Sequence, residues 1–117
     1  MMQFVRGDSF LFKVLLGSKG DEPINQNLVQ TLYITFRKYA NIDSDIIFQK
    51  TLSDVRIDDD GYCHASFLPE DTEDLAYGKY FFDIEVTLTN GYRKSRLYEV
   101  ELTKETTIHK VAGENNG

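Results

Sequence analysis

Every second residue from Tyr80 to Leu88 is apolar, and this alternation is the feature that most constrains the fold. A period of two residues is typical of a β-strand that buries one face and leaves the other face less covered. Asn90-Gly91 follows directly, and these residue types readily adopt the positive φ angles of a tight reversal. The segment therefore predicts a β-hairpin whose second strand runs from Arg93 to Leu102.

The register of this hairpin decides which face of the second strand is buried. A two-residue loop at Asn90-Gly91 would place Glu99 beside Phe82 on the apolar face, which is an unfavourable pair. We expect instead a register shifted by one residue, through a three-residue loop or a bulge near Leu97. The shifted register pairs three apolar residues of the second strand, Tyr98, Val100 and Leu102, with Ile84, Phe82 and Tyr80, in that order.

Shorter alternating segments before the hairpin predict further strands. Pro69 to Leu75 is the one predicted helical turn, because Pro suits a first-turn position and acidic residues favour the positive end of a helix. The fold class that we predict is an all-β, antiparallel, immunoglobulin-like β-sandwich of about seven strands with one short helical turn. The predicted strands are a lead-in at Phe4-Val5, Ser9 to Leu16, Thr31 to Lys38, Asp45 to Leu52, and two arms that meet at Asp58-Asp59-Asp60-Gly61.

At 117 residues the chain predicts one sandwich domain over residues 1–107 and a polar C-terminal tail over residues 108–117. Cys63 is the single cysteine, so packing and not a disulfide has to hold the fold. It lies within an alternating run, which predicts a small buried hydrophobe and not a nucleophile. The net charge of −6 opposes binding to nucleic acid or anionic lipid, and no apolar run is long enough for a membrane span or a secretory signal. We expect a soluble protein with neither partner.

Four features that could carry chemistry have simpler interpretations. Arg6-Gly7-Asp8 matches the integrin tripeptide but reads as a turn, and Asp58-Asp59-Asp60-Gly61 lacks the later ligands of a calcium loop. The carboxylates of residues 69–75 suit a solvated turn, and His64 and His109 have no zinc-ligand spacing. The sequence therefore predicts no catalytic residue, no cofactor, no metal ligand and no enzymatic activity.

Five motifs within residues 5–107 occur in a recognisable order: Arg6-Gly7-Asp8-Ser9-Phe10, Asp60-Gly61, Phe67-Leu68-Pro69-Glu70-Asp71-Thr72, Gly78-Lys79-Tyr80-Phe81-Phe82-Asp83-Ile84 and Asn90-Gly91. Together they resemble small β-sandwich domains of bacteriophage virion proteins, most closely the N-terminal domain of the baseplate upper proteins of tailed phages. The resemblance implies a non-enzymatic structural component of a phage tail, baseplate, connector or capsid surface, made in the host cytoplasm and located in the virion. It also implies an oligomer or larger assembly held by contacts with other virion proteins.

Contacts with such partners are predicted for the loop of residues 17–27 and for the C-terminal tail, because loops and termini of a sandwich remain free to bind. A carbohydrate-binding or adhesin-type module is the alternative hypothesis, and an enzyme is a third. Trp, the strongest sugar-stacking residue, is absent. The tyrosines that could stack on sugars are Tyr33, Tyr39, Tyr62, Tyr77 and Tyr92.

Overall fold

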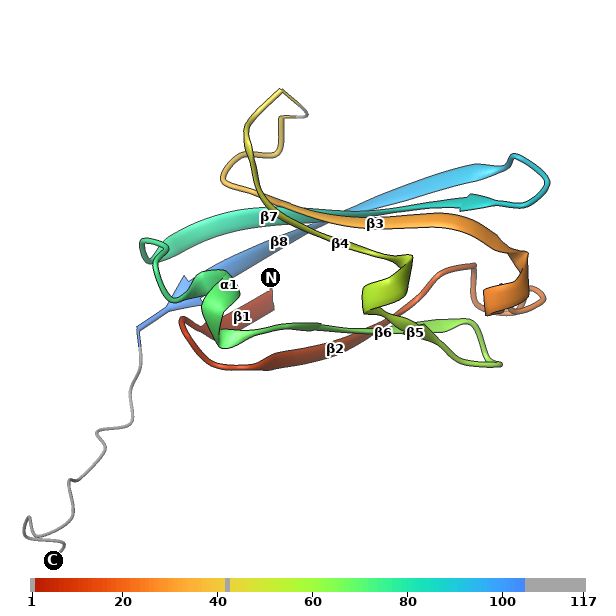
Figure 1. Cartoon of the computed structure of the whole chain (residues 1–117), viewed down its shortest axis with the longest axis horizontal. Helices are drawn as coiled ribbons and strands as arrows, with labels where there is room; N and C mark the ends of the chain where they lie inside the picture. The colour runs from red at the N-terminus through yellow and green to blue at the C-terminus, as the bar shows by residue number, and fades with distance from the viewer. Residues whose placement is uncertain (1, 42, 105–117) are drawn as a thin grey trace, which may run out of the picture.

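The computed structural model describes residues 2–41 and 43–104, which form two β-sheets packed face to face as a sandwich (Figure 1). Sheet A, the larger, has the strand order β1 (Met2–Val5), β8 (Arg93–Thr103), β7 (Gly78–Leu88), β3 (Val29–Arg37), β4 (Ile46–Thr51). Sheet B has the order β2 (Phe10–Leu15), β6 (Tyr62–Phe67), β5 (Arg56–Ile57). The short helical elements are the 3-10 turns η1 (Gln26–Leu28) and η2 (Leu52–Asp54) and the helix α1 (Pro69–Thr72).

The predicted β-sandwich and its one α-helical turn are confirmed, with two differences in detail. The described residues contain eight strands, and β1 pairs with β8 in parallel, with Met2 opposite Val100 and Val5 opposite Thr103. β1 lies beside β8 at the edge of sheet A, and the chain passes from the end of β1 directly to β2 in sheet B. β1 therefore has no hairpin partner that would make its pairing antiparallel. A four-residue lead-in carries no turn signal that could reveal its partner strand.

Arg6-Gly7-Asp8 forms the corner between β1 and β2, as the turn interpretation predicted. Gly7 has a φ of 81°, and its N–H donates to the hydroxyl of Thr72 in α1 over 3.0 Å. The Arg6 guanidinium donates to the carbonyl of Leu75 over 3.0 Å. The corner is therefore tied to the residues of α1 and of the turn that follows it.

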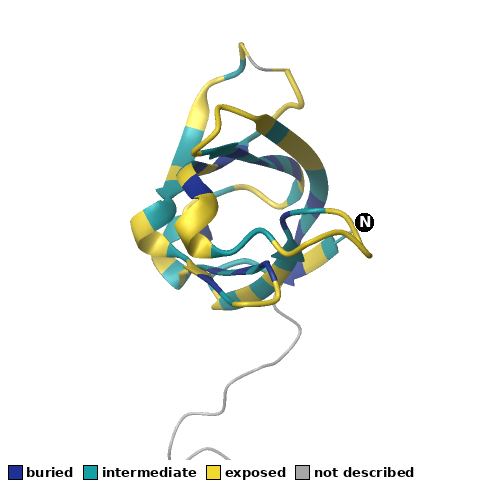
Figure 2. Ribbon diagram, turned by 90° about the vertical axis from the view of Figure 1, so that its right-hand side faces the viewer, coloured by how far each residue is buried: buried dark blue, intermediate teal, exposed yellow. Residues whose placement is uncertain are grey.

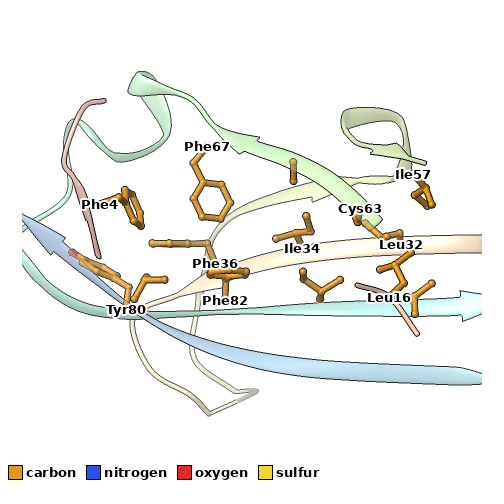
Figure 3. Close-up of a cluster of buried hydrophobic side chains, with 14 of the residues drawn as sticks. Phe4, Leu16, Leu32, Ile34, Phe36, Ile57, Cys63, Phe67, Tyr80 and Phe82 are labelled. Atoms are coloured by element: carbon orange, nitrogen blue, oxygen red, sulfur yellow. The ribbon is translucent and has the colours of Figure 1, made fainter. Parts of the chain in front are cut away.

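The centre of the core is an aromatic contact between the two sheets (Figure 3). Phe67 of β6 meets Phe36 of β3 at 5.5 Å and Phe82 of β7 at 5.3 Å between ring centroids, in both cases edge to face. None of the three rings is more than 1% exposed. Edge-to-face packing adds a specific attraction to the burial of large apolar area. Buried residues occur along strands of both layers (Figure 2).

The hairpin of β7 and β8 closes through a three-residue loop, Thr89 to Gly91, with the Leu88 N–H donating to the Tyr92 carbonyl over 2.8 Å. The expectation that Tyr98, Val100 and Leu102 take the inner face is confirmed, but their predicted partners are wrong by two residues. A three-residue loop sets Leu88 opposite Tyr92, and an unbroken ladder carries that offset along both strands, without a bulge near Leu97. The observed pairs are Phe82 with Tyr98, Tyr80 with Val100 and Gly78 with Leu102.

The observed register brings two basic residues, Lys94 and Arg96, opposite Val86 and Ile84 on the inner side of the hairpin. Their charged ends extend beyond the apolar surface. Arg96 donates to the carbonyl of Leu15 in β2, and Lys94 donates to the hydroxyl of Ser18 in the loop after β2, each over 3.4 Å. Long basic side chains can cover apolar surface with their stems in this way. The register therefore places Leu97 on the outer face of sheet A.

We predict that Phe82→Ala destabilises the domain by about 2 to 5 kcal/mol, because it removes a fully buried ring from the centre of the core. Phe81→Ala, which shortens a half-buried side chain on the outer face, should lower the free energy of unfolding by clearly less. Denaturant unfolding of both variants measures the difference. Equal losses at positions 81 and 82 would show that the outer face of β7 is also core.

We predict that Gly91→Val lowers the melting temperature, while Asn90→Asp leaves it nearly unchanged. Gly91 has a φ of 89° and open space around its Cβ position, so the cost, about 1 to 2 kcal/mol, is backbone strain and not a clash. Thermal unfolding followed by circular dichroism tests the contrast. Identical melting temperatures for both variants and the parent would contradict the three-residue loop.

Candidate functional site

A hollow of about 360 Å³ opens on the outer face of sheet A. Its floor is a row across four adjacent strands, in which Thr35 of β3 is paired with Gln49 of β4 and with Asp83 of β7, and Asp83 with Leu97 of β8. Thr35 and Asp83 are short side chains in the middle of the row, so the larger residues around them stand higher. The hollow is thus a consequence of small side chains at the centre of a flat strand face.

Larger side chains from the neighbouring rows form its walls. Tyr33 is paired with Glu85 on one side of the floor, and Arg37 is paired with Phe81 on the other. Tyr33 is 38% exposed and Leu97 is 53% exposed, whereas Phe81, Arg37 and Glu85 are half-buried. Aromatic, aliphatic and charged groups therefore meet within one surface depression.

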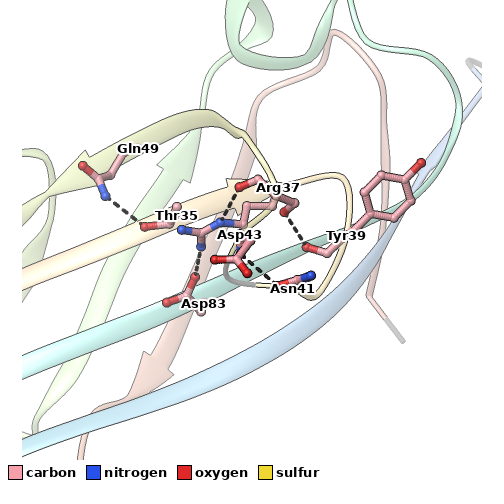
Figure 4. A network of polar contacts seen from close by, with 8 residues as sticks. Thr35, Arg37, Tyr39, Asn41, Asp43, Gln49 and Asp83 are labelled. Carbon is pink, nitrogen blue, oxygen red and sulfur yellow. Dashed lines mark hydrogen bonds and ion pairs between the residues drawn. The ribbon is translucent and has the colours of Figure 1, made fainter.

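Arg37 organises the polar part of the hollow (Figure 4). Its Nη1 lies 3.0 Å from Oδ1 of Asp83, and its Nε donates to the Ser44 carbonyl over 3.3 Å. Beside this pair the Gln49 amide donates to the Thr35 hydroxyl over 3.0 Å. These contacts fix the orientation of donors and acceptors before any ligand arrives.

The two carboxylates of the hollow outnumber its one cation. Burial raises the pKa of Asp83, the nearby Arg37 opposes that shift, and the negative charge of Glu85 adds to it. Within the described part of the chain, Glu85 forms no hydrogen bond and no ion pair through its side chain. The hollow therefore has an excess of one negative charge when both carboxylates are ionised.

The outer face of sheet B carries a second hollow of about 580 Å³ beside His64, which is more open to solvent than the first. Lys13 and Arg56 flank His64 on the two neighbouring strands, and its Nε2 lies 2.7 Å from Oδ2 of Asp58. The hydrogen bond from His64 is the main reason that the pKa of Asp58 is lowered. Because Asp58 also accepts the Tyr62 N–H over 3.0 Å, this pair holds the turn before β6.

The other motifs singled out from the sequence are parts of the fold. Asp58 to Gly61 forms a turn with Gly61 at a φ of 84°, as predicted, and Cys63 is fully buried, also as predicted. Among residues 2–41 and 43–104, no group of three or more His, Cys, Asp and Glu residues could hold a metal ion, and no helix is long and apolar enough to cross a membrane. His109 and the tail of residues 108–117 lie outside the described residues.

The five tyrosines proposed for sugar stacking are not brought together. Tyr33 and Tyr39 line the hollow on sheet A. Tyr62 lies under the Lys13 ammonium at 4.7 Å, and Tyr77 lies under the Arg6 guanidinium at 4.1 Å. Tyr92 flanks the hairpin loop.

The loop of residues 17–27 remains a predicted contact segment, but part of it is packed against the domain. Ile24 packs against the core, and a Cβ atom on Gly61 would lie 3.0 Å from the Ile24 nitrogen. The loop is therefore anchored at this residue beside the turn before β6.

Sequence reasoning did not identify four residues that line the hollow: Thr35, Arg37, Asp83 and Leu97. The alternation placed Thr35, Arg37 and Asp83 on outward faces, and this was the one sequence feature that pointed to them as surface residues. Their proximity depends on the pairing of β3 with β7 and on the hairpin register. Neither can be read from local pattern alone.

Comparison with known proteins gives the fold but no family. No protein-family model matches the chain, and no curated protein matches its sequence. The fold is similar to the crystal structure of CopC from Methylosinus trichosporium OB3b, with a TM-score of 0.52 and 12% sequence identity over 92% of this chain and 88% of that chain. At this identity the likeness shows a shared β-sandwich architecture alone.

The resemblance to phage virion domains is corrected by this comparison, because the fold is similar to that of CopC, which is not a phage protein. The motifs on which the resemblance rested have a physical role that any sandwich of this kind could use. Gly7, Gly61 and Gly91 all have positive φ at chain reversals, and Phe67 and Phe82 are core. Such residues report how the chain folds and carry little information about what it binds.

We predict that Cys63 is unreactive in the folded protein. Burial raises the pKa of its thiol to about 11, so at pH 8 the thiolate fraction should fall on the order of 100-fold relative to an unfolded thiol with a pKa of about 8.5. Reaction with a thiol reagent, with and without denaturant, measures this ratio. Equal rates in both states would contradict the burial.

The same shift has a consequence for stability. The unfolded thiol loses its proton at lower pH than the folded thiol, so this group lowers stability progressively as the pH rises from about 8.5 towards 11. A Cys63→Ala variant should lose this part of the pH dependence.

Proposed function

We propose that this chain is a non-enzymatic binding module that docks on a partner protein through the hollow on sheet A. The observation that carries the proposal is Leu97, an aliphatic side chain that is 53% exposed at the β8 end of the floor of the hollow, next to Asp83. The core is complete without it, because Val100, Leu102 and the partly buried Tyr98 already supply the inner face of β8. A partner that covers Leu97 would remove this apolar surface from water.

The composition of the hollow favours a protein partner. Protein interfaces are enriched in Tyr, Phe and Arg, and their energetic centres combine an aromatic or Arg anchor with a surrounding ring that excludes water. Tyr33, Phe81 and Arg37 provide these residue types, and Arg37 is already held by Asp83. A surface that is ordered before binding loses less conformational entropy when a partner arrives.

This proposal retains the expectation of a non-enzymatic domain that acts through protein contacts within a larger assembly. It moves the main contact from the loop of residues 17–27 and the tail to the strand face of sheet A. The comparisons supply no support for a place in a virion. The two polar segments remain predicted secondary contacts.

A carbohydrate-binding module is the second candidate, because one feature of the hollow favours it. The Arg37–Asp83 and Gln49–Thr35 pairs place several fixed donors and acceptors beside Tyr33 in a volume within the range of small-ligand pockets. Sugars are bound by such a combination of hydrogen bonds and aromatic contact. Saturable glycan binding by the purified domain, lost in Tyr33→Ala, would favour this candidate.

We predict that Leu97→Asp weakens partner binding by about tenfold or more, because a charge would then have to be buried at the centre of the interface. The matched control is Leu11→Asp, since Leu11 is 78% exposed on a strand of the opposite sheet. A photo-crosslinking amino acid at position 97 would first identify the partner in cells of the source organism. Titration calorimetry with the purified partner would then compare the two variants.

Weaker binding in Leu97→Asp alone supports the proposed surface. Weaker binding in Leu11→Asp alone would move the interface to sheet B. Equal effects of the two substitutions would contradict a specific role for the hollow.

A further inference from the structure

We propose that the partner inserts one basic side chain, an arginine or a lysine, into the hollow, with its charge at Glu85 and Asp83 and its stem against Tyr33. This inference rests on the proposed function and names the chemistry of the partner at the same site.

The first argument is the charge of the lining. Asp83 and Glu85 occupy alternate positions on β7 and therefore point to the same side of sheet A. Arg37 lies 3.0 Å from one oxygen of Asp83, which leaves Glu85 as the uncompensated charge of the described residues around the hollow. A half-buried carboxylate without a partner is stabilised by an incoming cation.

The second argument is the wall beside Glu85. Tyr33 is its direct neighbour across the β3–β7 pair, so the two side chains stand within reach of one ligand group. Three other tyrosines of this chain, Tyr62, Tyr77 and Tyr80, each have a basic side chain of the chain itself over the ring. Tyr33 has no such contact within residues 2–41 and 43–104, although its ring stands beside the acidic Glu85 and could accept a cation over its face.

The third argument is the field of the whole chain. A net charge of −6 attracts basic groups and repels acidic ones at long range. A basic anchor is therefore favoured both during approach and after it enters the hollow. A neutral sugar would gain nothing from the charge of the chain, and it would leave the excess carboxylate of the hollow without a counter-ion.

The test uses the whole chain and a small probe. Backbone amide shifts are followed by NMR during titration with Nα-acetyl-arginine amide and, separately, with Nα-acetyl-citrulline amide, which has nearly the same shape but no charge. We expect saturable shifts for residues of the hollow with the arginine probe and none with the citrulline probe. Glu85→Gln should lower the affinity for the arginine probe about fivefold, which is the effect of losing one favourable charge pair.

The matched control is Asp74→Asn, which makes the same change in net charge at an exposed residue after α1. It should leave the affinity for the arginine probe unchanged. Equal weakening in both variants would overturn the inference, because the attraction would then come from net charge and not from the hollow.

Other outcomes also separate the possibilities. Equal shifts with both probes, or absence of saturable shifts with the arginine probe, overturns the basic anchor. If a neutral monosaccharide gives saturable shifts in the hollow instead, the carbohydrate candidate takes its place. If Leu97→Asp abolishes binding of the partner and Glu85→Gln does not, the proposed function stands and only this inference is refuted.

Discussion

The structure depends on the contact of Phe67 with Phe36 and Phe82, in which an aromatic ring of sheet B meets two rings of sheet A edge to face. Cys63 is the single cysteine of the chain, so no internal disulfide can restrain the two layers. Packing of large apolar side chains is then the main source of stability. Every strand that reaches this contact has to turn alternate residues inward, which also determines the residues left on the outer faces.

The hollow on sheet A follows from that requirement. Phe36 and Phe82 have to point inward, so Thr35 and Asp83 point outward on the adjacent strands β3 and β7. The three-residue loop of the hairpin then sets Leu97 opposite Asp83. A loop one residue shorter would reverse the faces of β8 and would put Leu97 into the core. The binding surface and the core are thus fixed by the same register.

The sequence was sufficient for features that local pattern determines. Alternation around Phe82 and Ile84 predicted the buried face of β7, and Gly61 and Gly91 marked two reversals that the structure shows at positive φ. Features that depend on distant strands were not accessible. Arg37 and Asp83 are 46 positions apart, and their ion pair requires that β3 lie beside β7 in the sheet. The parallel partner of β1 and the offset of the hairpin pairs were missed because alternation fixes the face of a strand but not its neighbour or its exact partners.

The charges on β7 suggest that its outer face is not shaped by stability alone. Asp is disfavoured in strands, and burial of Asp83 raises the pKa of its carboxyl despite the guanidinium 3.0 Å away. Glu85 adds a second negative charge on the same face, so the ionised form of Asp83 is disfavoured further. β-branched side chains at both positions would suit a strand better and would avoid this cost. Binding surfaces commonly retain such costs, because groups that are suboptimal in the free protein gain their favourable partners in the complex.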